Sequence, residues 1–158
     1  MKLLMLSVLI ALQLTVAGCA SYYSAPANKP TAVMSFQTNM RPVMVQIFED
    51  ETCKSGKNGS RLAYIDPVFV KDGKYAGPVR VEADKLTVFT LRKNNLPGDA
   101  WSCAVTLSFT PEAGAEYIAS FVGQGGKCSA KFARKAGGEL ETVDDLRQIK
   151  KVCYNPNS

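Results

Sequence analysis

The strongest constraint on the fold is a strict two-residue alternation along Trp101–Phe109. Apolar side chains occupy every second position, and small or polar side chains occupy the positions between them. That period is typical of a β-strand with one buried face, and it does not fit an amphipathic helix. The residues of the buried face are Trp101, Cys103, Val105, Leu107 and Phe109, and those of the other face are Ser102, Ala104, Thr106 and Ser108.

Short segments of the same kind recur along the chain. They are rich in β-branched and aromatic residues and are separated by Gly, Pro, Asn or Asp, which favour turns. We therefore expect a mainly β protein, an immunoglobulin-like or transthyretin-like β-sandwich of about seven to eight strands. The other segments expected as strands are Val43–Phe48, Arg61–Ile65, Val79–Ala83, Leu86–Arg92, Ala115–Val122 and Lys127–Arg134.

Two turns connect the strands in the second half of the chain. Pro111 suits the second position of a type I turn, and Gly114 suits a position with positive φ. Gly123–Gly126 provides the next turn. With these turns, Trp101–Arg134 is predicted to form a simple meander of three neighbouring strands.

The C-terminal part carries the one pattern typical of a helix. Thr142 is suited to cap Val143–Lys151, in which acidic residues come first and basic residues last, as the helix dipole favours. We expect one short C-terminal helix here, and a final strand is the alternative.

Four cysteines lie in the predicted domain, at Cys53, Cys103, Cys128 and Cys153. Their number is even, and no pair has the C-x-x-C spacing of a zinc or thioredoxin site. In an exported protein this favours two disulfides.

The predicted meander also bears on the pairing of these cysteines. In a meander, Cys103 and Cys128 lie two strands, or about 9.6 Å, apart. A disulfide needs Cα atoms within about 7 Å. We therefore expect Cys53–Cys103 with Cys128–Cys153. The pairing Cys53–Cys128 with Cys103–Cys153 stays open, and so does Cys103–Cys128 if the strand switches sheets.

The N-terminus resembles a bacterial lipoprotein leader. Met1-Lys2 precedes the apolar run Leu3–Leu14, which is too short for a membrane span of about 20 residues. Val16–Cys19 then resembles the lipobox, and the resemblance implies that Cys19 becomes the first mature residue and carries lipid. An ordinary secretory leader with an incidental cysteine is the alternative. Ala20 follows the cysteine, and the sorting rule that comes with the resemblance then implies the outer membrane.

These features predict three parts of the chain. Residues 1–18 are the lipoprotein signal peptide, residues 19–32 are the lipidated N-terminus and a flexible tether, and residues 33–158 are the disulfide-bonded β-sandwich domain. The tether is inferred from Ser21–Thr31, which contains two prolines and no apolar period.

A second resemblance covers about a fifth of the chain, between the second and third cysteines of the domain. The order Cys, Phe-x-Pro-x-x-Gly-x-x-Tyr, Cys is similar to a hairpin of small proteobacterial lipoproteins of unknown function. This resemblance supports a fold more than an activity. The residues that match it are Cys103, Phe109, Pro111, Gly114, Tyr117 and Cys128.

The sequence argues against catalysis. It contains no histidine, which excludes Ser-His-Asp and Cys-His mechanisms and the usual zinc hydrolases. The stretch "GQGGKCS" fails the phosphate-loop pattern at Phe121 and Cys128. Glu49–Glu51 is an acidic run that could bind a cation or supply half of a glycosidase pair, but a solvated loop is favoured. We expect no enzyme, no cofactor, no metal and no small-molecule substrate.

Basic loops suggest a binding surface instead. The loop from Lys93 to Ala100 and the loop Gly123–Gly126 should fall at the same end of the meander. We call the residues gathered there the tip, and a solvated loop end is the alternative interpretation. The tip consists of Arg92, Lys93, Asn94, Asn95, Trp101 and Lys127.

Together these features predict a lipoprotein of the outer membrane that faces the periplasm and acts as a non-catalytic binding or assembly module. The alternatives are an inhibitor of an incoming hydrolase such as lysozyme and an accessory lipoprotein of a secretion system, the latter by fold analogy alone. Loss of Lys2 with the leader lowers the net charge from +5 to +4, which is too mild to indicate nucleic acid. We expect the membrane as one partner, through the lipid, and an envelope protein or anionic envelope polymer as the other.

Overall fold

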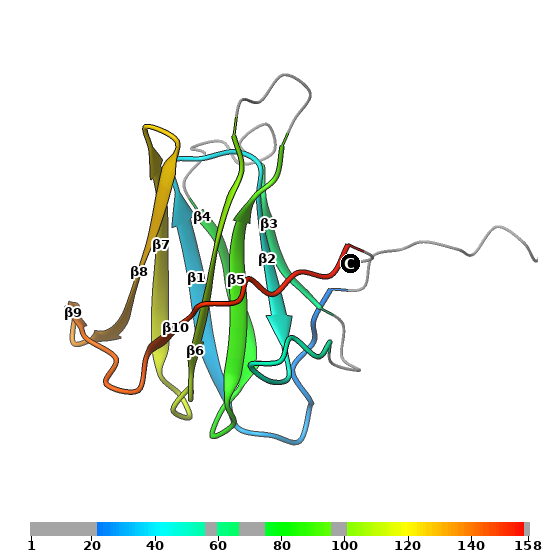
Figure 1. Cartoon of the computed structure of the whole chain (residues 1–158). Helices are drawn as coiled ribbons and strands as arrows, with labels where there is room; N and C mark the ends of the chain where they lie inside the picture. The colour runs from blue at the N-terminus through cyan, green and yellow to red at the C-terminus, as the bar shows by residue number, and fades with distance from the viewer. Residues whose placement is uncertain (1–21, 56–59, 67–74, 96–100, 157–158) are drawn as a thin grey trace, which may run out of the picture.

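The computed structural model describes residues 22–55, 60–66, 75–95 and 101–156, and within these ranges the chain forms ten strands and no helix (Figure 1). The mainly β prediction is therefore confirmed. The strands are β1 (Thr31–Thr38), β2 (Val43–Phe48), β3 (Arg61–Ile65), β4 (Tyr75–Glu82), β5 (Thr87–Lys93), β6 (Cys103–Phe109), β7 (Glu116–Gln124), β8 (Lys127–Ala136), β9 (Glu139–Glu141) and β10 (Arg147–Ile149).

The strands form two five-stranded sheets that pack face to face. The first sheet has the order β4-β1-β7-β8-β9, and the second has the order β10-β6-β5-β2-β3. Strands β1 and β7 run parallel, and every other pairing of the named strands is antiparallel. Both inner faces alternate apolar residues with outward-facing ones, so the core lies between the sheets.

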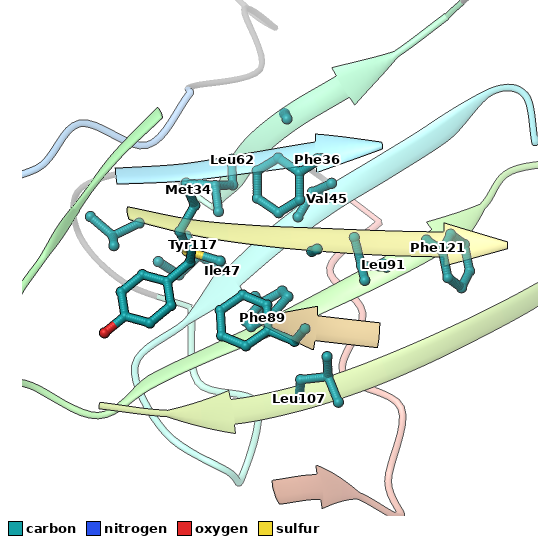
Figure 2. Packing of buried hydrophobic residues seen from close by; sticks show 14 of the residues in the cluster. Met34, Phe36, Val45, Ile47, Leu62, Phe89, Leu91, Leu107, Tyr117 and Phe121 are labelled. Carbon is teal, nitrogen blue, oxygen red and sulfur yellow. The ribbon is translucent and has the colours of Figure 1, made fainter. Parts of the chain in front are cut away.

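Aromatic rings join the two inner faces (Figure 2). Phe89 of the second sheet has its ring centroid 6.5 Å from that of Phe36 and 5.3 Å from that of Phe132, both in the first sheet. Phe109 lies 5.0 Å from Tyr117, and Tyr117 stacks on Phe132 at 5.4 Å. These rings pack edge-to-face, tilted or stacked, and such contacts add to the stabilisation from buried area.

The predicted meander over Trp101–Arg134 is wrong. Strand β6 lies in the second sheet and β7 in the first. The connection between them therefore passes from one sheet to the other instead of forming a hairpin. The crossing is anchored at Gly114, whose amide donates to the Thr31 carbonyl at 2.9 Å, and at Tyr117, whose hydroxyl accepts from the Glu112 amide at 3.0 Å. Gly114 has φ +76°, as the sequence predicts. Alternation fixes which side chains face the core, but it does not fix which strands pair.

The change of sheet between β6 and β7 also determines which cysteines pair. Two disulfides are present, as predicted, but the favoured pairing of Cys53–Cys103 with Cys128–Cys153 is wrong. The bonds are Cys53–Cys153, with Cα atoms 5.0 Å apart, and Cys103–Cys128, with Cα atoms 6.2 Å apart. Because β6 and β8 lie in facing sheets, Cys103 and Cys128 meet across the sandwich instead of being separated by an intervening strand.

The expected C-terminal helix is replaced by strand β10, which was the alternative. Residues 144–145 form a turn, and the Asp145 carboxylate accepts the Thr110 amide at 2.7 Å. Strand β10 then pairs antiparallel with β6, with Gln148 opposite Leu107. The physical reason is the edge of β6, whose backbone groups gain partners from β10 that a helix would not supply.

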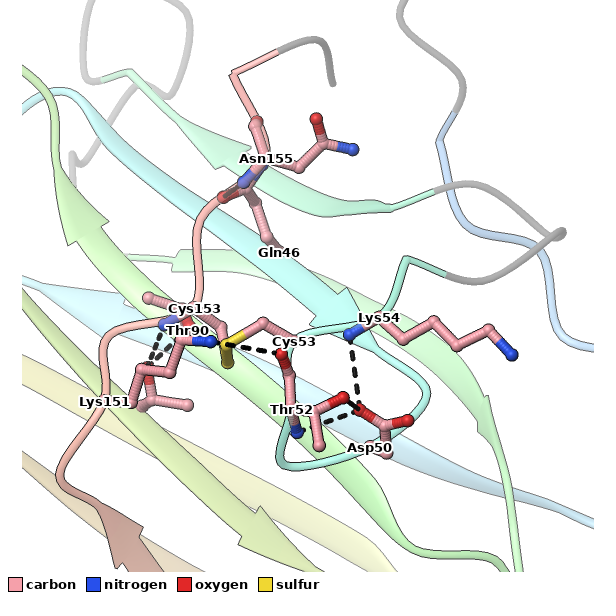
Figure 3. The surroundings of a disulfide bond; sticks show 10 residues. Gln46, Asp50, Thr52, Cys53, Lys54, Thr90, Lys151, Cys153 and Asn155 are labelled. Atoms are coloured by element: carbon pink, nitrogen blue, oxygen red, sulfur yellow. Dashed lines mark hydrogen bonds between the residues drawn. A yellow bond between two sulfur atoms is a disulfide. The ribbon is translucent and has the colours of Figure 1, made fainter.

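Beyond β10, the C-terminal tail crosses the outer face of the second sheet (Figure 3). The Cys153 amide donates to the Thr106 hydroxyl at 3.0 Å. The side chain of Gln46 donates to the Asn155 carbonyl at 2.7 Å and accepts from the Asn155 amide at 3.3 Å. The tail therefore covers polar side chains that the sheet would otherwise expose, and the Cys53–Cys153 bond holds it there.

The two bonds should differ in their effect on stability. In the chain-entropy account, the bond that closes the longer loop contributes more, and the sequence separations are 100 and 25 residues. The double variant Cys53→Ser/Cys153→Ser should therefore lower the free energy of unfolding by about 1 kcal/mol more than Cys103→Ser/Cys128→Ser. Urea denaturation of both variants measures the difference.

Peptide mapping without reduction gives the control for that prediction. It should yield the Cys53–Cys153 and Cys103–Cys128 peptides from the wild-type protein. A Cys53–Cys103 peptide as the main product would contradict the structure.

Candidate functional site

The strand ends that flank the two loops of the tip lie at one end of the sandwich (Figure 1), while residues 96–100 of the first loop lie outside the described residues. Strand β5 ends at Lys93 and β6 begins at Cys103, while β7 ends at Gln124 and β8 begins at Lys127. The Cys103–Cys128 bond ties these two strand pairs together. The β1–β2 connection reaches the same end, and the sequence analysis did not predict its contribution.

Lys93 does not belong to an exposed surface. Its side chain points inward and is only 7% exposed. Its Nζ donates to the Trp101 carbonyl at 3.2 Å and lies 5.2 Å from the centroid of the Trp101 ring. A cation held against an indole face in this way stabilises the loop. Lys93 therefore positions Trp101 instead of attracting a partner.

Arg92 points to the opposite face of the second sheet from Lys93. Its guanidinium lies 3.7 Å from the centroid of the Tyr154 ring, in the C-terminal tail. The backbone amide of Asn94 donates to the Pro42 carbonyl at 3.0 Å, while Asn95 and Lys127 are exposed. The six tip residues therefore do not form one surface.

Asn39, Met40 and Gly123 complete this end of the molecule; the sequence analysis named Gly123 only as a turn residue and did not name the other two. The Asn39 side chain makes two hydrogen bonds with the backbone of Gly123, donating to its carbonyl at 3.1 Å and accepting from its amide at 2.9 Å. A Cβ added at Gly123 would overlap the Met40 sulfur and lie 2.6 Å from the Trp101 ring. Met40 and Trp101 therefore pack on the bare backbone of Gly123. We call Asn39, Met40, Lys93, Trp101 and Gly123 the Trp101 site.

The chemistry of the Trp101 site is that of recognition. Trp101 is partly exposed and has a thioether, a glycine backbone and a buried cation around it. Arg41, in the β1–β2 connection, and Lys127, the first residue of β8, are exposed at this end. A rigidly supported tryptophan at a surface is the kind of residue that dominates binding energy at protein interfaces.

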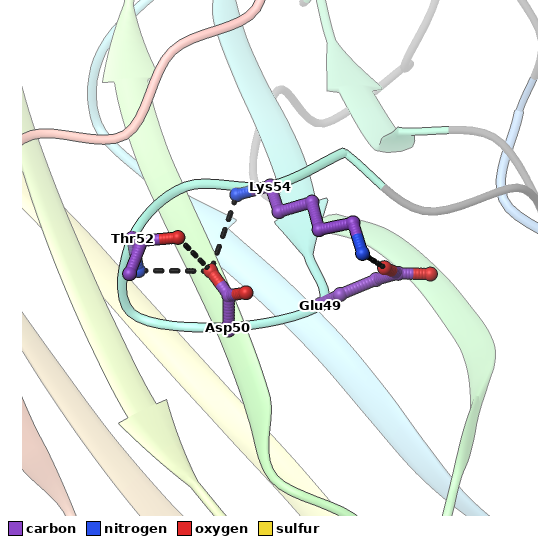
Figure 4. A network of polar contacts seen from close by, with 4 residues as sticks. All are labelled: Glu49, Asp50, Thr52 and Lys54. Carbon is purple, nitrogen blue, oxygen red and sulfur yellow. Dashed lines mark hydrogen bonds and ion pairs between the residues drawn. The ribbon is translucent and has the colours of Figure 1, made fainter.

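The acidic run Glu49–Glu51 is part of the fold (Figure 4). The Asp50 carboxylate accepts from the Thr52 amide at 2.9 Å, from the Thr52 hydroxyl at 2.6 Å and from the Lys54 amide at 3.3 Å. These hydrogen bonds, the one from the Thr52 hydroxyl first, lower the pKa of Asp50. Glu49 pairs with Lys54 at 3.5 Å, and Glu51 accepts from the Ser108 hydroxyl at 2.9 Å. The run stabilises the turn that directly follows β2.

Two further observations bear on the kind of site. Among the residues that the structure describes, no three His, Cys, Asp or Glu side chains lie close enough to hold a metal ion. In the same residues, no helix is long and apolar enough to cross a membrane.

Comparisons of the chain with protein-family models, with curated proteins and with solved structures found no match. The function is therefore argued from the site itself.

The packing around Gly123 can be tested with fluorescence, because Trp101 is the one tryptophan of the chain. Gly123→Ala should displace the indole, shift its emission to longer wavelength and destabilise the fold by about 1–3 kcal/mol, as overpacking does. The matched control is Ser129→Ala, at an exposed position of the next strand. It should change neither the emission wavelength of Trp101 nor the stability of the fold. An unchanged emission maximum in Gly123→Ala would show that Trp101 does not pack on this glycine.

Proposed function

We propose that this protein is a lipoprotein of the outer membrane, anchored through lipid on Cys19, that faces the periplasm and acts as a non-catalytic binding module. The observation that carries the proposal is the Trp101 site, a partly exposed indole fixed at one end of a disulfide-bonded sandwich. A surface of this kind binds with little loss of conformational entropy, because its side chains are already ordered.

The surroundings of the site support binding more than chemistry. The Lys93 ammonium group contacts the Trp101 carbonyl and ring, and carboxylates of the acidic run bond to Thr52 and Lys54 in the turn after β2. These charged groups are therefore engaged in the fold. The absence of histidine from the whole sequence supports the same assignment.

Within this proposal, the sandwich belongs with the transthyretin-like arrangement and not with the immunoglobulin-like one. In an immunoglobulin constant domain, the first two strands share a sheet with the fourth and fifth. Here β1 and β4 share one sheet, and β2 and β5 share the other. This strand order supports the assignment of the fold, and the assignment carries no function by itself.

We propose an envelope protein as the partner. Trp101 offers an aromatic anchor, and Arg41 and Lys127 add positive charge at its rim. An aromatic centre with a charged rim is typical of protein interfaces, in which the rim charges mainly affect the association rate.

Lipid attachment has a direct test. In the full-length protein, Cys19→Ser should abolish the incorporation of labelled palmitate and leave the protein out of the membrane fraction. The wild-type protein, labelled in parallel, is the control. Normal labelling of the variant would refute the anchor.

Partner binding has an independent test in cells. A photo-crosslinking amino acid at the exposed Asn95 should give a defined adduct with an envelope protein. The same group at exposed Lys135, near the far end of β8, should not. The adduct from position 95 should decline in the Arg41→Ser/Lys127→Ser variant, whose stability should stay within about 0.5 kcal/mol of the wild type.

The outcomes of that experiment separate the possibilities. A protein adduct at position 95 that depends on the two cations supports the proposal. Equal adducts from positions 95 and 135, or none from position 95, would overturn it.

A further inference from the structure

The segment before β1 is fixed to the domain, although the sequence assigns it to a flexible tether. Tyr22 forms a parallel bridge with Arg61, and the Tyr23 amide donates to the Arg61 carbonyl at 2.8 Å. The Tyr23 ring packs against the core, and its hydroxyl accepts from the Glu82 amide at 3.3 Å. At the other end of the segment, the Pro30 carbonyl accepts the Ala83 amide at 2.8 Å.

This segment therefore joins β3, the edge of the second sheet, to β1 and β4 of the first sheet. Burial raises the pKa of the Tyr23 hydroxyl, which agrees with its packed position. The chain is attached to the domain from Tyr22 onward. The longest possible distance between Cys19 and the domain is therefore set by the residues between Cys19 and Tyr22.

That free length is short. Only Ala20 and Ser21 separate Cys19 from Tyr22. Three peptide steps span at most about 11 Å. The headgroup layer on each side of a bilayer is itself about 5–8 Å thick. A lipid on Cys19 therefore leaves no room for the domain to stand away from the membrane.

The side chains around Tyr22 suit contact with headgroups. Tyr22 is 56% exposed and Tyr64 is 39% exposed. The Arg61 guanidinium lies 5.6 Å from the centroid of the Tyr22 ring. Tyrosines and arginine together are typical of the membrane interface, where an aromatic ring meets apolar chains and its polar end meets water.

A polar cavity of about 350 Å³ lies beside this group, along the same N-terminal segment. Its lining includes Tyr23 and the exposed cations Lys29 and Arg80. Two cations beside a short lipid-bearing segment suit the phosphate of a lipid headgroup. We call Tyr22, Lys29, Arg61, Tyr64 and Arg80 the N-terminal face.

We infer that the N-terminal face rests on the bilayer and that its partner is the phospholipid surface. The inference rests on the proposed function in one respect, the lipid on Cys19. Arg61 pairs with Gln46, and Gln46 pairs with Thr90 in the middle of β5, so the N-terminal face lies along the side of the sandwich formed by the β3 edge of the second sheet and the β4 edge of the first.

The test uses the full-length lipidated protein in vesicles of phosphatidylethanolamine and phosphatidylglycerol. An environment-sensitive fluorophore is attached to Lys29→Cys, to Tyr64→Cys or, as the control on β8, on the far side of the first sheet from β4, to the exposed Lys135→Cys. Lipids that carry a spin label at the headgroup should quench the first two reporters more strongly than the third. Mass spectrometry of each variant reports whether Cys19 is lipidated, independently of the quenching.

A second variant varies only the free length. About ten Gly and Ser residues inserted between Ser21 and Tyr22 should let the domain leave the surface. Quenching at positions 29 and 64 should then fall, and it should fall further when Tyr22→Ser is added. Emission of Trp101 and the non-reduced peptide map serve as checks that each variant is folded.

Each outcome has one interpretation. Lipidated protein with quenching at positions 29 and 64, lost on insertion, supports the inference. Lipidated protein with equal quenching at all three positions overturns it, and so does a reporter shielded from water but not quenched, because a second copy or another protein then covers the face. Absence of lipid on Cys19 refutes the anchor itself and is seen directly in the mass.

Discussion

The packing of three rings at the crossing between the sheets determines much of the rest of this structure. Phe109 ends β6 in one sheet, and Tyr117 and Phe132 come from β7 and β8 in the other. The ring centroid of Phe109 lies 4.5 Å from that of Phe132 and 5.0 Å from that of Tyr117. This contact sets β6 over β8. Cys103 and Cys128 can then bond across the sandwich, and their bond fixes the end that carries Trp101.

The outer face of the second sheet depends on a different kind of contact. Thr90 and Thr106 share a hydrogen bond of 2.8 Å and are fully or almost fully buried, as is Gln46. Buried hydroxyl and amide groups are stable only where they have partners, and the C-terminal tail supplies several of them. The tail is thus a third layer over the second sheet, and the stacking of Tyr154 on Arg92 continues that layer toward the Trp101 site.

The sequence predicted the parts of the fold that depend on local pattern. The positions of β2, β3 and β5–β8 follow from short apolar and alternating segments, although β1 was not among the strands expected, and the turn at Gly114 follows from its need for positive φ. The partners of each strand did not follow, because an inward-facing Phe109 looks the same whether the next strand pairs beside it or packs above it. The C-terminal segment was ambiguous for a related reason. Its charge order suits a helix, but the unpaired edge of β6 is a property of the whole sheet.

The candidate site divides in the same way. From the sequence we predicted two basic loops at one end of the domain, and the tip defined there includes Lys93 and Trp101. Continuing the alternation of β5 would have shown that Lys93 faces inward with Phe89 and Leu91. The packing of Met40 on Gly123 had no sequence signal, since a glycine beside a turn is expected for its flexibility and not for the space it leaves.

The nesting of the disulfides has a consequence for how this chain matures. The Cys103–Cys128 bond lies wholly inside the loop that Cys53–Cys153 closes. In a chain exported with its N-terminus first, Cys53 and Cys103 enter the oxidising compartment well before Cys153, and pairing in order of arrival joins the wrong two. Thiol–disulfide exchange must then release Cys53 for the last cysteine. If the chain is exported as proposed, a catalyst of disulfide rearrangement would therefore speed its correct folding more than an oxidant alone.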